Sequence, residues 1–497
     1  MKFKLVLIAV SLAIAGSGLI NRLMPSRVVQ APQQQKAGVA GRIQRVENGL
    51  LPSIIIKGQS SPMKLADRMV HYKVPGVSIA VISNGEIELA RGFGVVEADG
   101  NQPITAETLF QAGSISKPVA AMAALRLVEQ GKLSLDEDVN LKLKSWKAPE
   151  NEFTKEKKVT LRGILTHSAG LTVHGFPGYA ADVEVPTLVR VLDGEKPANT
   201  SAIRVDTTPG TRWRYSGGGF TIMQQLLIDV AGKTFPDLTR ELVLGPAGMN
   251  HSTYEQPLPK RLNAAAATAH RNGKPIKGRF HTYPEMAAAG LWTTPTDLAL
   301  LAIEIQQEIA GKSSKVLSQN MARQMTAKQF ENYGLGPGVD GSGQSARFAH
   351  GGVDEGFEAF WIAYQHTGQG AVIMTNGNGG SRLAQEIIRA IAKEYDWPDP
   401  PRPREKTLAK VDPKLYEAYA GQYDAGVRLT VSVENGHLYV LAPPLGPERV
   451  ELYPESETRF FMLADNISIS FEKDEQGQVN KILVHFGGGT REGKRVR

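Results

Sequence analysis

Cysteine is absent from the 497 residues. The chain therefore forms no disulfide, no thiolate metal site and no lipoprotein acyl anchor. Hydrophobic residues make up 41% and charged residues 22%, which is ordinary for globular protein. A chain of this length buries a large core without covalent staples, and its length favours roughly three domains.

Several signatures of other function classes are also missing. There is no H-E-x-x-H, and the ten histidines are scattered without ligand spacing. Asp136-Glu-Asp138 lacks the EF-hand pattern and is interpreted as a solvated turn. The net charge of +7 lies partly at the two ends, with no basic stripe interleaved with aromatic residues. We expect no metal, no cofactor and no nucleic-acid partner.

The N-terminus resembles an export signal. Met1–Lys4 is positively charged, Leu5–Ile14 is apolar, and Ala13–Ala15 offers small residues for cleavage. We expect a secreted or periplasmic protein, with a signal segment and polar linker over residues 1–38. An uncleaved membrane anchor is the alternative, although an apolar stretch of about 16 residues is short for a span of ~20.

The most informative segment is Ser114-Ile-Ser-Lys117, which opens an alanine- and leucine-rich run ending at Gly131. Residues three apart share a helix face, so the Lys117 amine can reach the Ser114 hydroxyl. A serine becomes a good nucleophile when a neighbouring base takes its proton. The first turn also offers free backbone N–H groups for an oxyanion.

The S-x-x-K pattern occurs three times, at Ser61–Lys64, Ser114–Lys117 and Ser470–Lys473. Ser61 precedes a proline in a polar loop, and Ser470 alternates with apolar residues as in a strand. Only Ser114 begins a helical pattern, with Pro118 in its first turn. On the pattern alone, an ordinary buried helix start remains as good an explanation as catalysis.

Strand patterns at both ends of the main unit predict an α+β fold. Residues 76–82 and 86–90 flank Asn84-Gly85 and predict a hairpin. Helical patterns dominate residues 118–330, and strands return at 356–364 and 370–375. We expect one antiparallel sheet, completed by distant segments and flanked by helices with a helical subdomain, over residues 45–395.

A second, smaller domain is expected after a proline-rich linker. The linker, residues 396–411, contains Trp397-Pro-Asp-Pro-Pro-Arg-Pro403. Beyond it, residues 412–497 show short strand patterns at close spacing, including a hairpin signal at Asn435-Gly436. These patterns predict a small all-β barrel or sandwich.

Two further segments carry candidate site residues. Tyr215 lies in a glycine-rich turn that feeds a helix, where a loop can aim its phenol into a cleft. His350-Gly-Gly352 precedes the strand at 357–364, and paired glycines let a ligand or backbone approach closely. A tyrosine packed at a helix start, and a bulge beside an incidental histidine, are the structural alternatives.

In this order the segments resemble the serine β-lactamase and penicillin-binding-protein family, especially its class C β-lactamase, D-aminopeptidase, D-stereospecific carboxypeptidase and esterase branch. The family pattern S-x-x-K, Y-S-x and H-x-G appears as Ser114–Lys117, Tyr215–Gly217 and His350–Gly352. The resemblance covers about residues 60–395. Residues 415–423 resemble the start of lipocalin-like domains that follow such catalytic domains.

The resemblance implies a residue role at each matching position. Ser114 is then the acylated nucleophile, Lys117 polarises it, and Tyr215 shuttles the leaving-group proton. The backbone N–H groups of Ser114 and Val353 form the oxyanion hole. Gly217, Gly351 and Gly352 border the substrate, and His350 stands where many relatives have the lysine that holds a substrate carboxylate.

The expected activity is hydrolysis of an ester, amide or D-amino-acid peptide bond through an acyl-enzyme. Gly217 replaces an asparagine and His350 a lysine of β-lactam recognition, which favours esterase or peptidase activity. A histidine with its pKa near ~6.5 predicts better use of carboxylate substrates as the pH falls toward 6.

Two other classes of protein fit parts of the sequence. A Ser-His-Asp hydrolase using His167 or His174 lacks the G-x-S-x-G elbow, and His167 is interpreted as a structural histidine bonding loop backbone. A non-catalytic protein that binds penicillin or peptidoglycan fragments remains the alternative from another class. The expected partner is a small-molecule or peptide substrate, possibly cell-wall derived, and the sequence leaves the oligomeric state open.

Overall fold

A six-stranded antiparallel sheet and a closed eight-stranded barrel organise the structure, a computed structural model that describes residues 32–59, 62–443, 449–463, 467–486 and 489–496. The helices are α1 Pro32–Glu47, α2 Leu65–Tyr72, α3 Ser116–Glu129, α4 Leu161–Leu165, α5 Leu188–Asp193, α6 Gly217–Ala231, α7 Phe235–Thr239, α8 Met286–Ala289, α9 Pro295–Ile309, α10 Gln319–Thr326, α11 Gly380–Glu394 and α12 Tyr416–Tyr419.

The large sheet has the order β3-β2-β11-β10-β9-β8. The strands before the barrel are β1 Ile54–Ile56, β2 Gly76–Ser83, β3 Glu86–Gly94, β4 Phe110–Gln111, β5 His270–Arg271, β6 Lys274–Pro275, β7 Trp292–Thr293, β8 Gly338–Asp340, β9 Arg347–Asp354, β10 Phe357–Tyr364, β11 Gly370–Thr375 and β12 Arg404–Lys406. Strand β2 pairs with β11, so segments almost 300 residues apart complete one sheet, and the predicted α+β fold is confirmed.

The first hairpin follows from its turn residues. Asn84 and Gly85 both have positive φ, 54° and 75°, as a tight turn between twisted strands requires. The predicted hairpin is therefore confirmed, and β2 is buried along almost its whole length.

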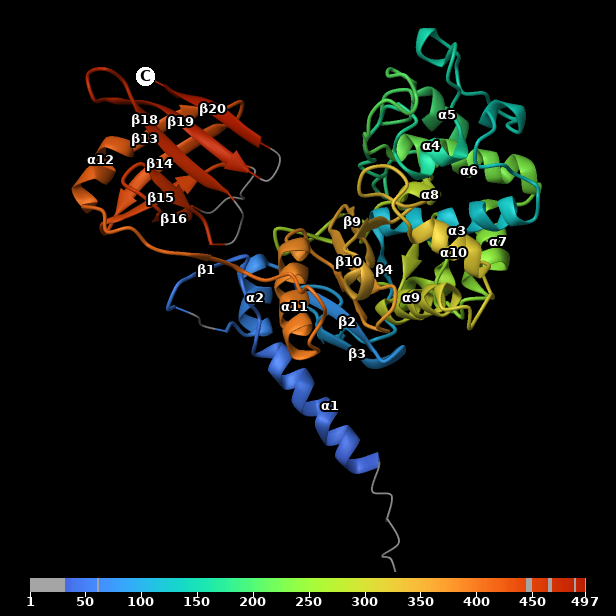
Figure 1. Cartoon of the computed structure of the whole chain (residues 1–497), viewed down its shortest axis with the longest axis horizontal. Helices are drawn as coiled ribbons and strands as arrows, with labels where there is room; N and C mark the ends of the chain where they lie inside the picture. The colour runs from blue at the N-terminus through green and yellow to red at the C-terminus, as the bar shows by residue number, and fades with distance from the viewer. Residues whose placement is uncertain (1–31, 60–61, 444–448, 464–466, 487–488, 497) are drawn as a thin grey trace, which may run out of the picture.

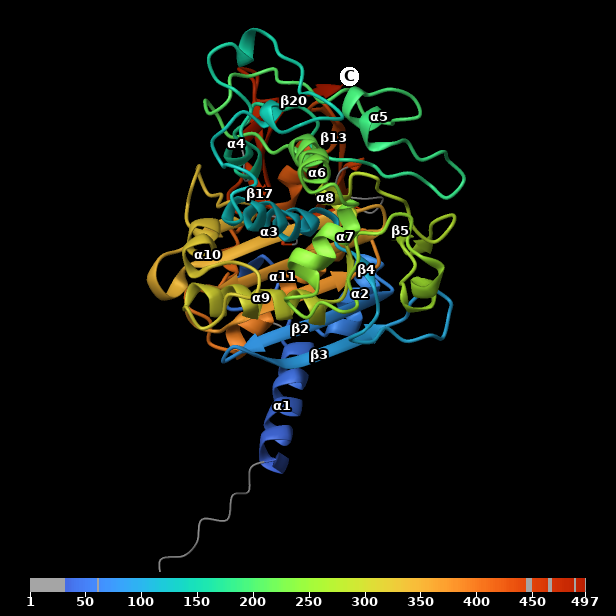
Figure 2. The same cartoon turned by 90° about the vertical axis from the view of Figure 1, so that its right-hand side faces the viewer.

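Helices cover both faces of the sheet (Figures 1 and 2). Helices α2 and α11 pack on one face, and α9 packs on the other, where a larger core continues into the helices from α3 to α8. Along β9 the side chains alternate between these faces. Phe348 enters the larger core and Ala349 packs toward α11, so His350, Gly352 and Asp354 share the Phe348 face.

Residues 32–38, expected as part of a linker, are helical, because α1 begins at Pro32. Proline is well suited to a first helical position, and the following glutamines, lysine and alanine are good helix formers. The polar composition that suggested a linker is thus equally compatible with an exposed helix. The predicted signal segment lies within residues 1–31, outside the described residues.

The C-terminal strands close into a barrel in the order of the sequence. They are β13 Gly421–Asp424, β14 Arg428–Glu434, β15 His437–Leu441, β16 Val450–Pro454, β17 Arg459–Phe461, β18 Ser468–Lys473, β19 Val479–Phe486 and β20 Gly489–Val496. The sequence patterns did not identify β13, β16 and β20. Strand β20 is rich in charged residues and glycine, so it has little of the apolar alternation that marks a strand.

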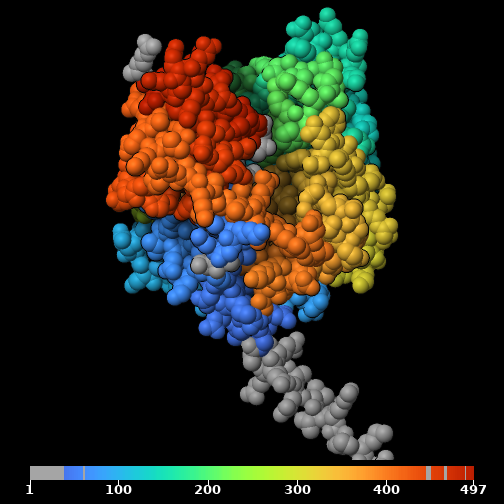
Figure 3. Space-filling model, turned by 60° about the vertical axis from the view of Figure 1, so that its left-hand side comes forward, coloured from blue at the N-terminus to red at the C-terminus, as the bar shows by residue number. Residues whose placement is uncertain are grey.

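The segment between the two domains is held by contacts on both sides. Strand β12 pairs in parallel with β1, and Ile54 and Ile56 pack against Phe461 of the barrel. Trp397 is buried against Tyr364, with ring centroids 5.3 Å apart. In the view of Figure 3 a hollow separates the barrel from the helical part of the larger domain.

None of the helices in the described part of the chain is both long enough and apolar enough to cross a membrane.

Candidate active site

Ser114 and Lys117 lie together where a tight turn becomes a helix. Ser114 is the middle residue of the 3₁₀ turn Gly113–Ile115, and Lys117 is the second residue of α3. Lys117 Nζ donates to Ser114 Oγ at 2.9 Å and to the Ala288 carbonyl of α8 at 2.8 Å. The second contact holds the amine beside the serine, so the structure brings this predicted pair into hydrogen-bonding distance.

The charge of Lys117 is set by its burial. The side chain is almost fully shielded from solvent, and burial lowers the pKa of the amine to about 7, while Asp354 acts in the opposite direction. Charged and neutral amines are then both populated near neutral pH. A neutral amine has a free lone pair, so Lys117 is chemically fit to accept the Ser114 proton.

Tyr215 points its ring at the same pair. Its ring centroid lies 5.0 Å from Lys117 Nζ, and Ser216, the next residue, caps α6 by accepting a hydrogen bond from the Gly219 N–H. Burial raises the pKa of the Tyr215 phenol, and a hydrogen bond with Ser114 partly opposes the rise. The phenol therefore stays protonated at neutral pH, where it can donate a proton but is a poor resting base.

Histidines surround the tyrosine, and their roles differ. His167 accepts a hydrogen bond at Nδ1 from the Ser216 N–H, and its ring lies 4.2 Å from that of Tyr215. The structural role predicted for His167 is confirmed, and burial lowers its pKa well below the usual range. The His174 ring is tilted against that of Tyr215, with centroids 4.9 Å apart, and His174 lines the cavity.

His350 is present at the site but differs chemically from the expectation. Its Nδ1 lies 2.6 Å from the Gly351 carbonyl oxygen, a geometry in which Nδ1–H donates. Burial, together with the nearby Lys117 charge, lowers the pKa of His350 to about 4. The ring is therefore neutral near pH 7, and its Nε2, which has no partner among the described residues, presents a lone pair. The expected pH switch near 6 is wrong for this environment.

The backbone around Val353 fits the proposed oxyanion hole. A two-residue turn joins β9 to β10, so Asp354 and Phe357, which flank it, form a hydrogen-bonded pair. Such pairs alternate along an antiparallel ladder with pairs that are not hydrogen-bonded. Val353 and Glu358 form the next pair, so the Val353 N–H points away from β10. On that side lies Gly113, where an added Cβ would come within 2.4 Å of Val353 N. The Val353 N–H thus faces the turn that carries Ser114.

The three predicted substrate-binding glycines divide into two groups. Gly351 and Gly352 line the cavity. A Cβ at Gly352 would lie 1.9 Å from the Ala112 carbonyl oxygen, which explains the glycine in this strand. Gly217 lies apart from the cavity wall: its N–H bonds the His174 carbonyl, and a Cβ would press on Phe176. For Gly217 the structure indicates packing of a loop.

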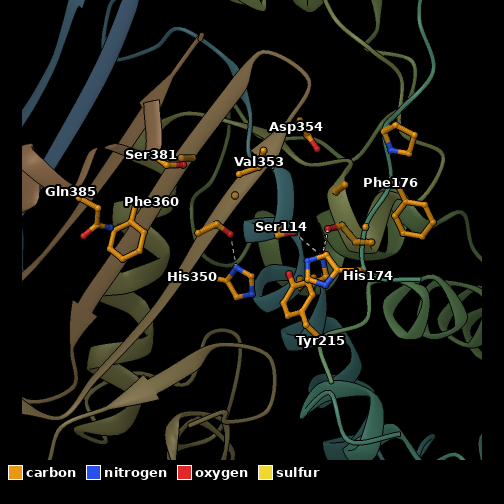
Figure 4. Close-up of a pocket in the computed structure, with 18 residues that line it drawn as sticks. Ser114, His174, Phe176, Tyr215, His350, Val353, Asp354, Phe360, Ser381 and Gln385 are labelled. Carbon is orange, nitrogen blue, oxygen red and sulfur yellow. Dashed lines mark hydrogen bonds between the residues drawn. The ribbon is translucent and has the colours of Figure 1, made fainter. Parts of the chain in front are cut away.

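The cavity around Ser114 has a volume of about 710 Å³. Figure 4 shows Phe360, Ser381 and Gln385 on one side of Ser114, and His174 and Phe176 on the other. Sequence reasoning considered His174 only as the base of a Ser-His-Asp hydrolase, and it missed the other four residues and Asp354. The alternation of β9 could have indicated Asp354, because it places residues 350, 352 and 354 on one face. The other lining residues come from loops, from β10 and from α11, where no local pattern marks them.

No cluster of three or more histidine, aspartate or glutamate side chains suited to a metal ion occurs within the described residues. The arrangement provides a buried base, a hydroxyl, a phenol and inward-facing backbone N–H groups. These are the components of acyl transfer at a serine.

Comparison with known proteins places these features in a family. Residues 63–396 match the beta-lactamase family, and residues 405–494 match a family described as a domain of unknown function, DUF3471. The chain is 24% identical to penicillin-binding protein 4* of Bacillus subtilis (strain 168), over 82% of this chain and 93% of that protein. It is 26% identical to esterase EstB of Burkholderia gladioli, over 41% of this chain and 52% of that protein.

A solved structure extends the likeness of fold to most of the chain. The octameric penicillin-binding protein homologue from Pyrococcus abyssi aligns with a TM-score of 0.59 and 21% identity, covering 86% of this chain and 98% of that one.

Proposed function

The chain belongs to the beta-lactamase family, and on this basis we propose that it is a serine hydrolase that forms a covalent acyl-enzyme at Ser114. The observation that supports this most is the 2.9 Å contact between Ser114 Oγ and the buried Lys117 amine. Burial lowers the pKa of this lysine to about 7. A substantial share of the amine is then neutral near pH 7 and can accept a proton.

The proposed reaction begins with transfer of the Ser114 proton to neutral Lys117. The serine oxygen forms a bond to the substrate carbonyl carbon, and the carbonyl oxygen takes up the negative charge. The N–H groups of Ser114 and Val353 stabilise that charge, and one such donor contributes about 2.7–4 kcal/mol in comparable hydrolases.

Collapse of this intermediate breaks the bond to the leaving group, which receives a proton from the Tyr215 phenol. Lys117, still carrying the serine proton, returns one to Tyr215. A water molecule then attacks the acyl carbon, and Lys117 with Tyr215 accepts its proton. The Ser114–acyl bond breaks, the Ser114 oxygen takes back this proton from Lys117, and the acid product leaves.

We propose esters, amides or D-amino-acid peptides, including peptides derived from the cell wall, as the substrate range. The cavity supports this range. Lys117 is the single lysine or arginine among the residues that line the described cavity, and its contacts are directed at Ser114 and Ala288. A carboxylate such as that of a β-lactam therefore meets no dedicated cation, since His350 is neutral. Export through the N-terminal segment is part of the same proposal.

Covalent labelling tests the proposal. A fluorescent alkyl fluorophosphonate is expected to add one adduct per chain, and peptide mapping to locate it at Ser114. A turnover screen with p-nitrophenyl esters, D-amino-acid amides, D-Ala-D-Ala peptides and nitrocefin then ranks the substrates. Reversible binding of penicillin or peptidoglycan fragments, with no adduct and no turnover, would instead favour the non-catalytic binding protein.

A further inference from the structure

The Asp354 side chain occupies an unusual position for a carboxyl group. It lines the cavity beside Ser114 and is 6% exposed. No side chain in the described part of the structure donates a hydrogen bond to either of its oxygens. Buried carboxyl groups are normally paired, because an unpaired one loses its hydration without compensation.

The surroundings of Asp354 supply one backbone group, the Gly113 N–H, whose hydrogen bond lowers the pKa of the carboxyl, but no side-chain partner. Lys117, the nearby cation, directs its two hydrogen bonds to Ser114 and to the Ala288 carbonyl. Burial raises the pKa of the Asp354 carboxyl, and the Lys117 charge and the Gly113 N–H act in the opposite direction. Glu285, a second buried carboxyl group, adds a smaller rise by repulsion. Neither Glu285 oxygen has a hydrogen-bond partner among the described residues. Asp354 and Glu285 are thus two buried carboxyl groups without side-chain partners among the described residues.

His350 adds a further acceptor on the same face of β9. Its Nδ1–H is directed at the Gly351 carbonyl, so the unpartnered Nε2 presents a lone pair. When Asp354 is ionised, its carboxylate and the His350 Nε2 are both acceptors without a side-chain donor. A ligand that complements such a wall brings N–H groups, and a positively charged one pairs with a carboxylate most strongly.

On the basis of the proposed hydrolase function, we propose that Asp354 binds an ammonium group carried by the substrate close to the scissile carbonyl. The preferred substrates are then esters or amides of amino acids with a free amino group. Pairing with the ammonium group ionises Asp354 and compensates its burial. Both oxygens are shielded in the free enzyme, so binding includes a rotation of this short side chain toward the cavity it lines.

Two phosphonates that differ in one group test the inference. Diphenyl 1-aminoethylphosphonate carries an amino group next to phosphorus, and diphenyl ethylphosphonate lacks it. In both, the Ser114 oxygen bonds to phosphorus and phenol leaves. We expect the amino compound to label the wild-type protein about 10-fold faster or more, as suits one charge-assisted hydrogen bond. Both enantiomers of the amino compound are used.

Variants at two neighbouring carboxylates test whether the preference for the amino compound depends on Asp354. Asp354→Asn is expected to reduce the rate ratio to about 1–3, and Asp354→Glu, which keeps the charge, to retain part of it. Glu355→Gln is the matched control: it removes a carboxylate one residue further on, where Glu355 pairs with Arg271 outside the cavity. This control is expected to keep the wild-type ratio.

The outcomes separate the two proposals. Equal labelling rates in the wild-type protein, or a preference that survives in Asp354→Asn, would overturn the ammonium site and leave the serine hydrolase intact. Labelling by neither phosphonate nor by a fluorophosphonate would overturn both. The comparison on wild-type protein needs no variant, so it decides even if Asp354→Asn fails to fold.

Discussion

The same four-residue pattern, S-x-x-K, occurs in two regions of the described structure, and the serine contacts the lysine in only one of them. At Ser114–Lys117 a 3₁₀ turn runs into α3, and the serine and lysine meet at 2.9 Å inside the protein. At Ser470–Lys473 the pattern lies on β18, where residues three apart point to opposite faces of the barrel wall. There Ser470 bonds His485 instead, at 2.9 Å, and Lys473 is exposed.

The difference shows what the pattern itself lacks. The helix start supplies the spacing, and burial then makes the lysine a base by lowering its pKa. On the strand neither condition holds. Ser61–Lys64, the third match, cannot be compared, because Ser61 lies outside the described residues.

Removal of either serine hydroxyl gives the sharpest contrast. Ser114→Ala is expected to lower turnover by about 10⁴–10⁶-fold, since losing the nucleophile of a comparable hydrolase has an effect of that order. Ser470→Ala is expected to leave turnover within about 2-fold, because surface changes rarely propagate. The measurement is kcat/KM with a p-nitrophenyl ester. Comparable losses in the two variants would remove the distinction between the regions.

The base and the phenol are expected to act as one unit. Lys117→Ala and Tyr215→Phe should each lower kcat/KM by about 10²–10⁴-fold, the usual value of general acid–base catalysis. The double variant should lose little more, as found for residues that share one step. Lys473→Ala serves as the control with no effect. If the loss of kcat/KM in the double variant equals the product of the two single losses, Lys117 and Tyr215 serve separate steps.

His350 is expected to give no pH switch in the neutral range. Its pKa of about 4 lies below the assay range, so the ring stays neutral as the pH falls from 8.5 to 5.5. The kcat/KM ratio of a carboxylate-bearing substrate to its neutral analogue should then vary less than about 2-fold. His350→Lys should raise this ratio about 10-fold by adding a cation. A rise of the wild-type ratio toward pH 6 would restore the sequence-based expectation.

The barrel is expected to matter least for chemistry. Its residues are absent from the described cavity wall. Its contact with β1 and β12 consists of a small apolar cluster and an ion pair between Lys406 and Glu455. A chain ending at Asp399 keeps the buried Trp397 and should retain kcat/KM for a small ester within about 10-fold. Limited proteolysis should cut within residues 398–403. Loss of folding, seen by circular dichroism, would show that the barrel is part of the catalytic unit.

The sequence was informative wherever one local pattern determines one local structure. The Asn84-Gly85 turn and the helix after Ser114 could be predicted in this way. The state of His350 could not, because it depends on burial and on a bond to Gly351 that only the folded strand provides. Gly217 was assigned by its place in a motif, whereas the structure shows it packed against the His174 loop.

The most direct test of the account is the titration of Lys117 in the wild-type protein. Lysine labelled with ¹³C at Cε gives one NMR signal per residue, and Lys117→Arg identifies the signal of Lys117 by its loss. The account predicts a midpoint near pH 7, as burial dictates, against about 10.4 for an ordinary lysine. A Lys117 signal that titrates above about pH 9 would mean that the amine stays charged, and that the proposed base for Ser114 is wrong.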